Sequence, residues 1–262
     1  MLTVALVHKK LNEIIASRGK KGTKPKDLMR QLESLAKMSI QFGPRTEIPV
    51  LMHLISAQFD LQRSIDEYMD TAMWRFSAAS LGRVADFCKT NPDMRLVLMT
   101  ADDISDMIIS SQKEQSAAKI KGTPDADEVL INPTSGEVET AAERVERLRA
   151  EEDSKLSADE RNKIKVAGSM AVFMHRLEEE YVKSLQKTNP HTPEYVDRLK
   201  DEGVLLDVLS GVQHYFEKTS ATSEVAELSL LRLEHMYYKH DTIAVSVVKA
   251  TKFNKLYVRE RA

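Results

Sequence analysis

The sequence contains only one cysteine, Cys88, among its 262 residues. A single thiol excludes an internal disulfide and any metal site built from several cysteines. Intracellular chains in reducing compartments commonly have this composition, so cysteine usage favours the cytoplasm or the nucleus.

Long hydrophobic runs and an excess of charge of one sign are also missing. No apolar run approaches the roughly 20 residues needed to cross a bilayer. The start, "MLTVALVHKKLNEI", becomes charged too early for a secretory signal. Because 38 Lys and Arg residues face 40 Asp and Glu residues, the net charge is only −2. Any contact with nucleic acid or a membrane surface would therefore need a local patch.

Glycine and proline are scarce, at 9 and 8 residues, whereas methionine is frequent at 12. This balance favours helices over turn-rich β structure. Apolar residues recur at three- and four-residue steps, which is the period of an amphipathic helix. We therefore predict an all-α fold, with helix stripes at Val4, Val7, Leu11 and Ile14; Leu28, Leu32, Leu35 and Phe42; Leu51, Leu54, Ile55 and Phe59; Trp74, Leu81, Val84 and Cys88; and Phe173, Leu177, Tyr181 and Leu185.

Residues that end or begin helices fall between these stripes. Gly43 with Pro44, and Asn91 with Pro92, are typical of helix ends. Thr192 precedes Pro193 as a capping hydroxyl does before the first turn of a helix. The run "RLVLMT" from Arg95 is the nearest candidate for a strand, and that alternative stays open beside the helical interpretation.

The last two predicted helices carry much apolar surface. In the helix from Pro193, Val196 and Leu199 share a packing face, and Gly203 loosens the middle. The helix from Thr222 or Ser223 is apolar around most of its circumference and is expected to lie between two neighbours. Short turns between successive helices predict antiparallel helical hairpins stacked as a TPR/HEAT-like solenoid, without a strict sequence repeat.

The composition changes in the middle of the chain. The stretch "GTPDADEVLINPTSGEV" is rich in turn residues, and the segment after it is highly charged with little apolar content. We predict three parts: an N-terminal helical block over 1–110, a charged linker with one or two exposed helices over 111–165, and a C-terminal helical block over 166–262.

Signals for catalysis are weak. The run "RGKKGT" lacks the order of a phosphate-binding P-loop. His175 and Glu178 share a helix face as metal ligands can, but no companion motif is present, and a surface ion pair is the other interpretation. Cys88 lies in an apolar stripe and is interpreted as a small buried hydrophobic residue. We predict no enzyme activity, no catalytic residue, no metal and no cofactor.

Two clusters of basic residues are candidates for contacts with phosphate. The first is the basic loop 18–26, and the second lies near the C-terminus at Lys249, Lys252, Lys255, Arg259 and Arg261. Binding to RNA or to the ribosome through such residues weakens steeply with salt. A solvated loop is the alternative, because no base-stacking aromatics lie nearby in the sequence. The candidate RNA contacts are Arg18, Lys20, Lys21, Lys24 and Lys26.

Four long segments, in this order, resemble the c-subunit of eukaryotic translation initiation factor three: "VHKKLNEIIASRGKKGT", "DEYMDTAMWRFSAASLGRVADFCKTNP", "EEEYVKSLQKTNPHTPEYVDRLKDE" and "LLRLEHMYYKHD". The resemblance implies a non-catalytic, cytoplasmic scaffold that binds the small ribosomal subunit and supports pre-initiation complex assembly. The implied partners are other subunits of the factor, the a-subunit first and the b-subunit second, and ribosomal RNA. No membrane contact is implied.

The resemblance covers the helical middle region of such a protein, without its acidic N-terminal tail and its C-terminal PCI module. The segment 111–165 departs from the family by its length and charge. Candidate protein-interface residues are His235, Tyr237 and Tyr238. Two alternatives remain: an RNA-binding module acting through the basic loop 18–26, and a scaffold subunit of a related PCI complex such as the proteasome lid or the signalosome.

Overall fold

The computed structural model describes residues 4–20, 22–61, 67–105, 109, 130–131, 138–139, 162–237 and 239. These residues are predominantly helical, as predicted. They form two compact units, each of which joins segments that are distant in the sequence. Unit 1 combines residues within 1–61 and 93–168, and unit 2 combines residues within 62–92 and 169–262. The division into parts at residues 110 and 165 stays a prediction.

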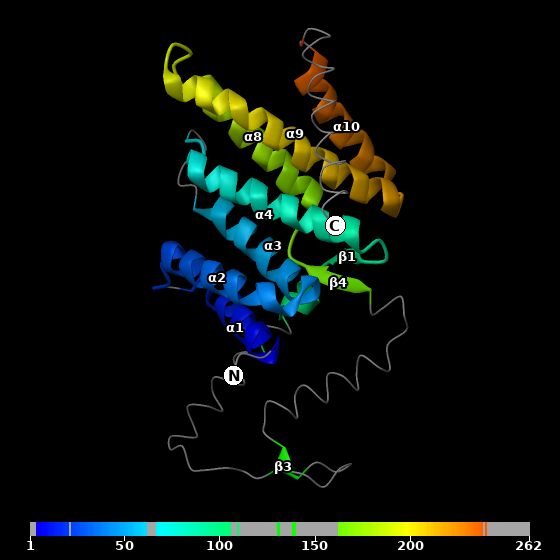
Figure 1. Cartoon of the computed structure of the whole chain (residues 1–262). Helices are drawn as coiled ribbons and strands as arrows, with labels where there is room; N and C mark the ends of the chain where they lie inside the picture. Colours follow the sequence, from blue (N-terminus) through cyan, green and yellow to red (C-terminus); the bar gives the residue numbers. More distant parts are fainter. Residues whose placement is uncertain are drawn as a thin grey trace. The chain divides into compact units, whose positions relative to one another are not determined.

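Unit 1 contains the helices α1 (Val4–Ser17), α2 (Pro25–Ser39) and α3 (Pro44–Asp60), with a 3-10 turn η1 (Ile40–Phe42) before α3, and a short helical stretch at 101–105. The helix α2 packs against both α1 and α3 (Figure 1). The predicted stripes form the core, since Leu11, Leu35 and Ile55 are almost fully buried. Gly43 adopts φ +83°, a conformation that favours glycine, and Pro44 then begins α3 as predicted.

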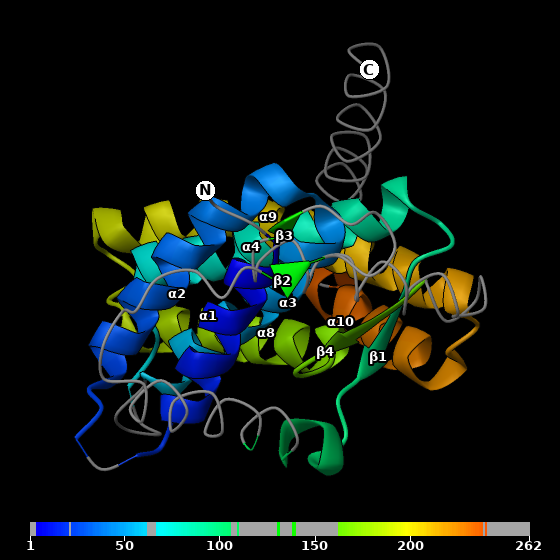
Figure 2. The same cartoon turned by 90° about the horizontal axis from the view of Figure 1, so that it is seen from below.

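A two-stranded parallel sheet in unit 1 pairs β1 (Arg95–Leu98) with β4 (Lys163–Val166), which lie side by side in Figure 2. The less favoured alternative at Arg95, a strand, is therefore correct. The strand β4 was not predicted. In β4, two exposed lysines alternate with the buried Ile164 and Val166, which is the two-residue period of a strand. A run of only four residues inside a charged segment is too short for this period to be recognised from the sequence. A second, antiparallel pair joins β2 (Leu130–Ile131) to β3 (Val138–Glu139).

Unit 2 contains α4 (Thr71–Thr90), α8 (Met170–Lys187), α9 (Pro193–Thr219) and α10 (Thr222–Tyr237). Consecutive helices α8, α9 and α10 pack as hairpins, and α4 packs against both α8 and α9 (Figure 1). The cap of α9 is as predicted, because the Thr192 hydroxyl accepts a hydrogen bond from the Tyr195 amide at the start of this helix. Stacking of the hairpins into a solenoid stays a prediction.

Two packing expectations for unit 2 are wrong. Val196 and Leu199 are 53% and 42% exposed, while the charged residues Arg198 and Asp201 take the buried face of α9. On α10, Leu230 and Leu233 are 57% and 56% exposed, so the described residues cover one side of this helix. The helix α9 also runs through Gly203 without interruption.

Candidate functional site

The basic loop 18–26 connects α1 to α2 through two glycines with positive φ. Gly19 has φ +78° and Gly22 has φ +101°, which turn the chain sharply. The amide of Lys20 donates to the Ser17 carbonyl at 3.2 Å, and the amide of Thr23 donates to the Lys20 carbonyl at 3.2 Å. The loop is therefore held by its own backbone next to the start of α2.

The charged side chains of this loop differ in their surroundings. The Arg18 guanidinium binds the Asp60 carboxylate and, at 3.0 Å, the Ser56 hydroxyl, both on α3. Lys20, Lys24 and Lys26 are exposed to solvent. Lys21 lies outside the described residues. Arg18 is thus engaged in the packing of unit 1, whereas the three described lysines present their charge to solvent.

A groove of about 670 Å³ runs between α1 and α2. Its floor contains Ile14, Leu28 and Leu35, which are themselves buried. Its lining includes side chains of both charge signs, among them Lys10 and Arg30 as well as Glu13 and Asp27. The groove therefore has a mixed lining of polar and apolar surface.

His53 lies on α3 close to the Arg18 contact. Its side chain is deeply buried, with a residue exposure of 6%. Burial, and secondarily the positive charge of Arg18, lower the pKa of His53 to about 4. The imidazole is therefore neutral at physiological pH and takes part in the packing of unit 1.

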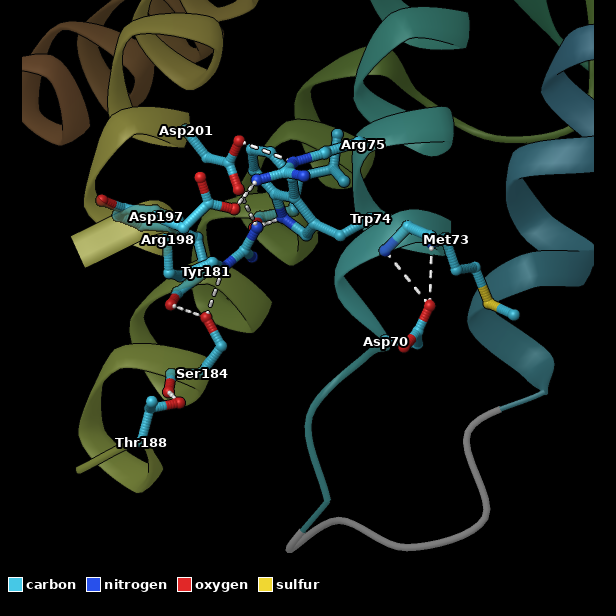
Figure 3. Close-up of polar contacts among 12 residues, drawn as sticks. Asp70, Met73, Trp74, Arg75, Tyr181, Ser184, Thr188, Asp197, Arg198 and Asp201 are labelled. Atoms are coloured by element: carbon cyan, nitrogen blue, oxygen red, sulfur yellow. Dashed lines mark hydrogen bonds and ion pairs between the residues drawn. The ribbon is translucent and has the colours of Figure 1, made fainter. Parts of the chain in front are cut away.

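In unit 2, Arg198 lies over two neighbouring aromatic rings, Trp74 and Tyr181, whose centroids are 5.8 Å apart (Figure 3). Its guanidinium carbon is 4.1 Å from the centroid of Trp74 and 5.0 Å from that of Tyr181. Nε donates to the Ser184 hydroxyl at 2.7 Å, and the Trp74 indole donates to the Leu177 carbonyl at 2.7 Å. Cation–π contacts strengthen when both partners are shielded from water, as they are here.

Asp201 connects this buried arginine to a second one on α4. Its two carboxylate oxygens accept from Nη1 of Arg198 at 2.9 Å and from Nε of Arg75 at 2.8 Å. Arg75 also binds Asp197 at 2.8 Å, a contact that remains half exposed. The hydrogen bond to Asp201, and after it the one to Asp197, raises the pKa of Arg75. Burial has the opposite effect on Arg198 and lowers the pKa of its guanidinium. The network of Arg75, Arg198, Asp201 and Asp197 thus ties α4 to α9 inside unit 2.

A third polar cluster surrounds His235 on α10. Its two ring nitrogens lie 3.5 Å from Glu178 Oε1 and 3.2 Å from Glu202 Oε1. Lys239 reaches the other oxygen of Glu202 at 2.6 Å. The carboxylates of Glu178 and Glu202 raise the pKa of His235 to about 9, against the opposing effect of burial. A protonated His235 therefore links α10 to both α8 and α9.

The three candidate interface residues have different surroundings. The His235 side chain is only 10% exposed and already pairs within the chain. Tyr237 is 72% exposed, and Tyr238 lies outside the described residues. Of the three, Tyr237 is the one that the structure shows at the surface.

Of the residues considered for chemistry, Cys88 is buried and His175 lies part-exposed beside a carboxylate. Cys88 is 2% exposed, and burial raises the pKa of its thiol to about 12. His175 lies 3.7 Å from Glu227 of α10. Within the described ranges, no group of three or more His, Cys, Asp or Glu side chains is placed to hold a metal ion. None of the helices described here is both long enough and apolar enough to span a bilayer.

Sequence reasoning missed the network around Arg198. The available signal was a pair of opposite charges three residues apart, Arg198 and Asp201, in helical register with the apolar Leu205. Such pairs are common on exposed faces, so the spacing alone does not indicate burial. The partner Arg75 lies more than a hundred positions earlier in the chain.

Comparison with known proteins decides the family. A family model described as "Eukaryotic translation initiation factor 3 subunit 8 N-terminus" matches residues 1–126 and 128–260. The chain belongs to this family. The description names the N-terminus, so the assignment to the helical middle region stays a prediction about the location of the chain within the longer protein.

Individual members of the initiation factor 3 family show the same relationship. The chain is 30% identical over 235 residues to the C-subunit of eukaryotic translation initiation factor 3 from Mycosarcoma maydis, covering 90% of this chain and 21% of that protein. The corresponding C-subunits of Xenopus tropicalis and Schizosaccharomyces pombe are 26% and 29% identical, each over 92% of this chain and 21% and 22% of their own length. The chain thus spans about a fifth of the curated relatives that it matches.

Proposed function

We propose that this chain is part of a non-catalytic scaffold subunit of translation initiation factor 3. In this role it binds other subunits of the factor, the a-subunit first and the b-subunit second, and the small ribosomal subunit. It supports assembly of the pre-initiation complex in the cytoplasm. The observation that carries the proposal is the family match, which extends over nearly the whole chain.

The packing of unit 2 supports a mechanical role. Its helices are joined by buried polar contacts as well as by apolar side chains, as the Arg198 contacts with Trp74 and Asp201 illustrate. Geometrically specific contacts of this kind favour one arrangement of the helices over others. Hairpins held in a fixed arrangement present partner-binding surfaces at constant spacing, and a TPR/HEAT-like stack would extend that surface.

The family match favours the initiation factor over the other scaffold alternative. Subunits of the proteasome lid or of the signalosome share helix-rich architecture, which alone does not separate them from this chain. The matched family model is that of an initiation factor 3 subunit.

A tagged form of the full chain tests the scaffold proposal by recovery from cytosol at low and at high salt. Recovery of initiation factor 3 subunits that persists at high salt supports it. The Asp201→Asn variant should lose these subunits because it disrupts unit 2, while Asp197→Asn serves as the matched control. Failure of the wild-type chain to recover any subunit of the factor contradicts the proposal.

A second candidate function is RNA binding through the basic loop 18–26. The exposure of Lys20, Lys24 and Lys26 favours it, since exposed lysines on a turn can reach phosphates. Arg18 contributes less in this proposal because Asp60 already engages its guanidinium. Such binding would add a salt-dependent contact with the small ribosomal subunit to the scaffold role.

A further inference from the structure

The hairpin formed by α1 and α2 carries a surplus of positive charge. Its described residues, 4–20 and 22–39, contain eight lysines and arginines against three acidic residues, although the whole chain has a net charge of −2. A local surplus of this kind attracts partners of the opposite charge and disfavours partners of the same charge. Charge complementarity therefore points to an acidic partner for this part of unit 1.

The positive charge of α2 lies mainly along one line of the helix. Lys26, Arg30 and Lys37 are exposed and follow one another at steps of four and seven residues, which places them on the same side. We call these three residues the basic ridge. Glu33 lies on the same line but is partly buried. Arg30 forms an ion pair with Asp27 at 3.8 Å, yet its side chain remains 77% exposed. The basic ridge therefore presents its charge to solvent.

The basic ridge borders the groove between α1 and α2. Arg30 belongs to the ridge and also lines the groove. The next line around α2 faces the groove and follows steps of four, three and four residues, through Asp27, Gln31, Ser34 and Met38. At the rise of an α-helix, this line is about 17 Å long, or three turns. The groove thus has the length to receive a short helix, with positive charge along one of its sides.

The lining of the groove favours a protein helix over nucleic acid. Its floor is aliphatic at Ile14, Leu28 and Leu35, and Met38 adds an adaptable thioether. In the part of the chain that the structure describes, no aromatic ring on which a base could stack lines the groove. A volume of about 670 Å³ admits several side chains of a peptide. Amphipathic helices commonly bind in this way, with their apolar side laid into a groove.

We propose that the groove between α1 and α2 binds an acidic amphipathic helix of a partner protein. The apolar stripe of that helix enters the groove, and its carboxylates face the basic ridge. On the α1 wall, Lys10 and Glu13 have opposite charges, so the preference for acidic residues comes from the α2 side. The proposal rests on the scaffold function proposed above, to which it adds a surface and the chemistry of the partner.

Synthetic helical peptides and the full 262-residue chain provide the test, with binding measured by fluorescence anisotropy. The probe is a labelled peptide of about 14 residues, or four turns, with leucines at steps of three and four and glutamates beside them. One control peptide has lysines in place of the glutamates, and another has glutamines in place of the leucines. The first peptide should bind about tenfold more tightly than either control. Equal affinity for one of the controls, or no binding of the first peptide, would overturn the proposal.

Neutralising the basic ridge tests its part in the binding. The triple variant Lys26→Gln, Arg30→Gln and Lys37→Gln should bind the acidic peptide about tenfold more weakly, because three exposed ion pairs of modest strength are lost together. The matched control neutralises three exposed lysines of unit 2, Lys89, Lys187 and Lys218. It should change the affinity by less than about twofold, since salt screens distant charges. An equal loss in both triple variants contradicts the assignment of the ridge.

A substitution at Ser34 tests the groove itself. This residue is exposed and lines the groove, so Ser34→Tyr should fill the groove and abolish binding of the acidic peptide. Ser34→Ala keeps the groove open and should bind like the wild type. Circular dichroism checks the helix content of all variants. Undiminished binding by Ser34→Tyr would show that the peptide binds elsewhere.

Two other occupants of the groove would give different results, and each contradicts the proposal. An oligouridine that binds more tightly than the acidic peptide, and that Ser34→Tyr no longer binds, assigns the groove to RNA. A wild-type dimer that Ser34→Tyr dissociates assigns it to a second copy of this chain.

The outcome for the groove is separable from that for the scaffold function. If the peptides fail to bind while the wild-type chain still recovers initiation factor 3 subunits from cytosol, only the groove assignment is wrong. Binding of the acidic peptide without recovery of any subunit of the factor contradicts the scaffold function instead.

Discussion

The guanidinium of Arg198 lies 4.1 Å from the centroid of the Trp74 ring, although the two residues come from helices separated by a large part of the sequence. Arg198 is 3% exposed and Trp74 is fully buried. A charge in this position is stable only because Asp201 and Ser184 accept its hydrogen bonds. The relationship explains how α4 and α9 are held together in unit 2.

Removing the charge of Asp201 should destabilise unit 2 strongly. Asp201→Asn leaves Arg198 buried without its counterion, and loss of one partner of a buried pair costs about 3 kcal/mol in unfolding free energy. Asp197→Asn, which removes the half-exposed partner of Arg75, should cost much less, because solvent screens this contact. Urea denaturation monitored by circular dichroism measures both, and equal losses would show that burial of Asp201 is unimportant.

The His235 cluster should make the stability of unit 2 fall at alkaline pH. The folded-state pKa of about 9 is above the ordinary value of 6.5. Protonation is therefore favoured by folding, so the stabilisation is complete below pH 6.5 and is lost as pH rises through 9. The loss is at most about 3 kcal/mol. Denaturation midpoints of the wild type and of His235→Gln, measured between pH 6.5 and pH 9, report this loss of stability. If the midpoints of both proteins fall in parallel with pH, the His235 cluster is not the cause of the loss.

His53 should give unit 1 the opposite dependence. Its folded-state pKa of about 4 is below the ordinary 6.5, so folding favours the neutral imidazole. The stabilisation is complete above pH 6.5 and is lost as pH falls towards 4, by up to about 3 kcal/mol. Hydrogen exchange of α3 amides between these pH values, corrected for intrinsic exchange rates, detects it. His53→Gln should remove the acid sensitivity; a variant as acid-sensitive as the wild type contradicts this assignment.

The basic loop should contribute to RNA affinity in a salt-dependent way. Reversing Lys20, Lys24 and Lys26 to glutamate removes up to three phosphate contacts, which should reduce the slope of log affinity against log salt by about 2 for a single-stranded RNA. The control reverses Lys37, Lys89 and Lys200, three exposed lysines elsewhere in the chain. Fluorescence anisotropy with a labelled RNA measures the affinity of both variants as a function of salt. An equal reduction of affinity and of slope in the two variants would show that only the net charge matters, not the position of the lysines.

The local features of the fold could be predicted from the sequence. The stripe of Trp74, Leu81, Val84 and Cys88 is buried as expected. The cap at Thr192 and the helix start at Pro44 are also as predicted. Each of these depends on residues within one or two turns of each other, so the spacing of side chains contains the necessary information.

The candidate site was predicted less completely. The basic loop 18–26 was located correctly as a turn between helices, but the pairing of Arg18 with Asp60 was not expected. His235 was expected at a surface and instead lies between Glu178 and Glu202. In each case the partner comes from another helix, and sequence spacing does not show which helices meet.

The sequence by itself determined where the helices of this protein lie and to which family it belongs, because both follow from residues read in order along the chain. Only the tertiary structure decided which faces are buried. It placed Arg198 and Asp201 inside unit 2 and left Val196 and Leu199 exposed, against the pattern of hydrophobicity. The physical reason is that Arg75, Trp74 and Tyr181 come together from distant helices and make burial of a charged pair more favourable than its hydration.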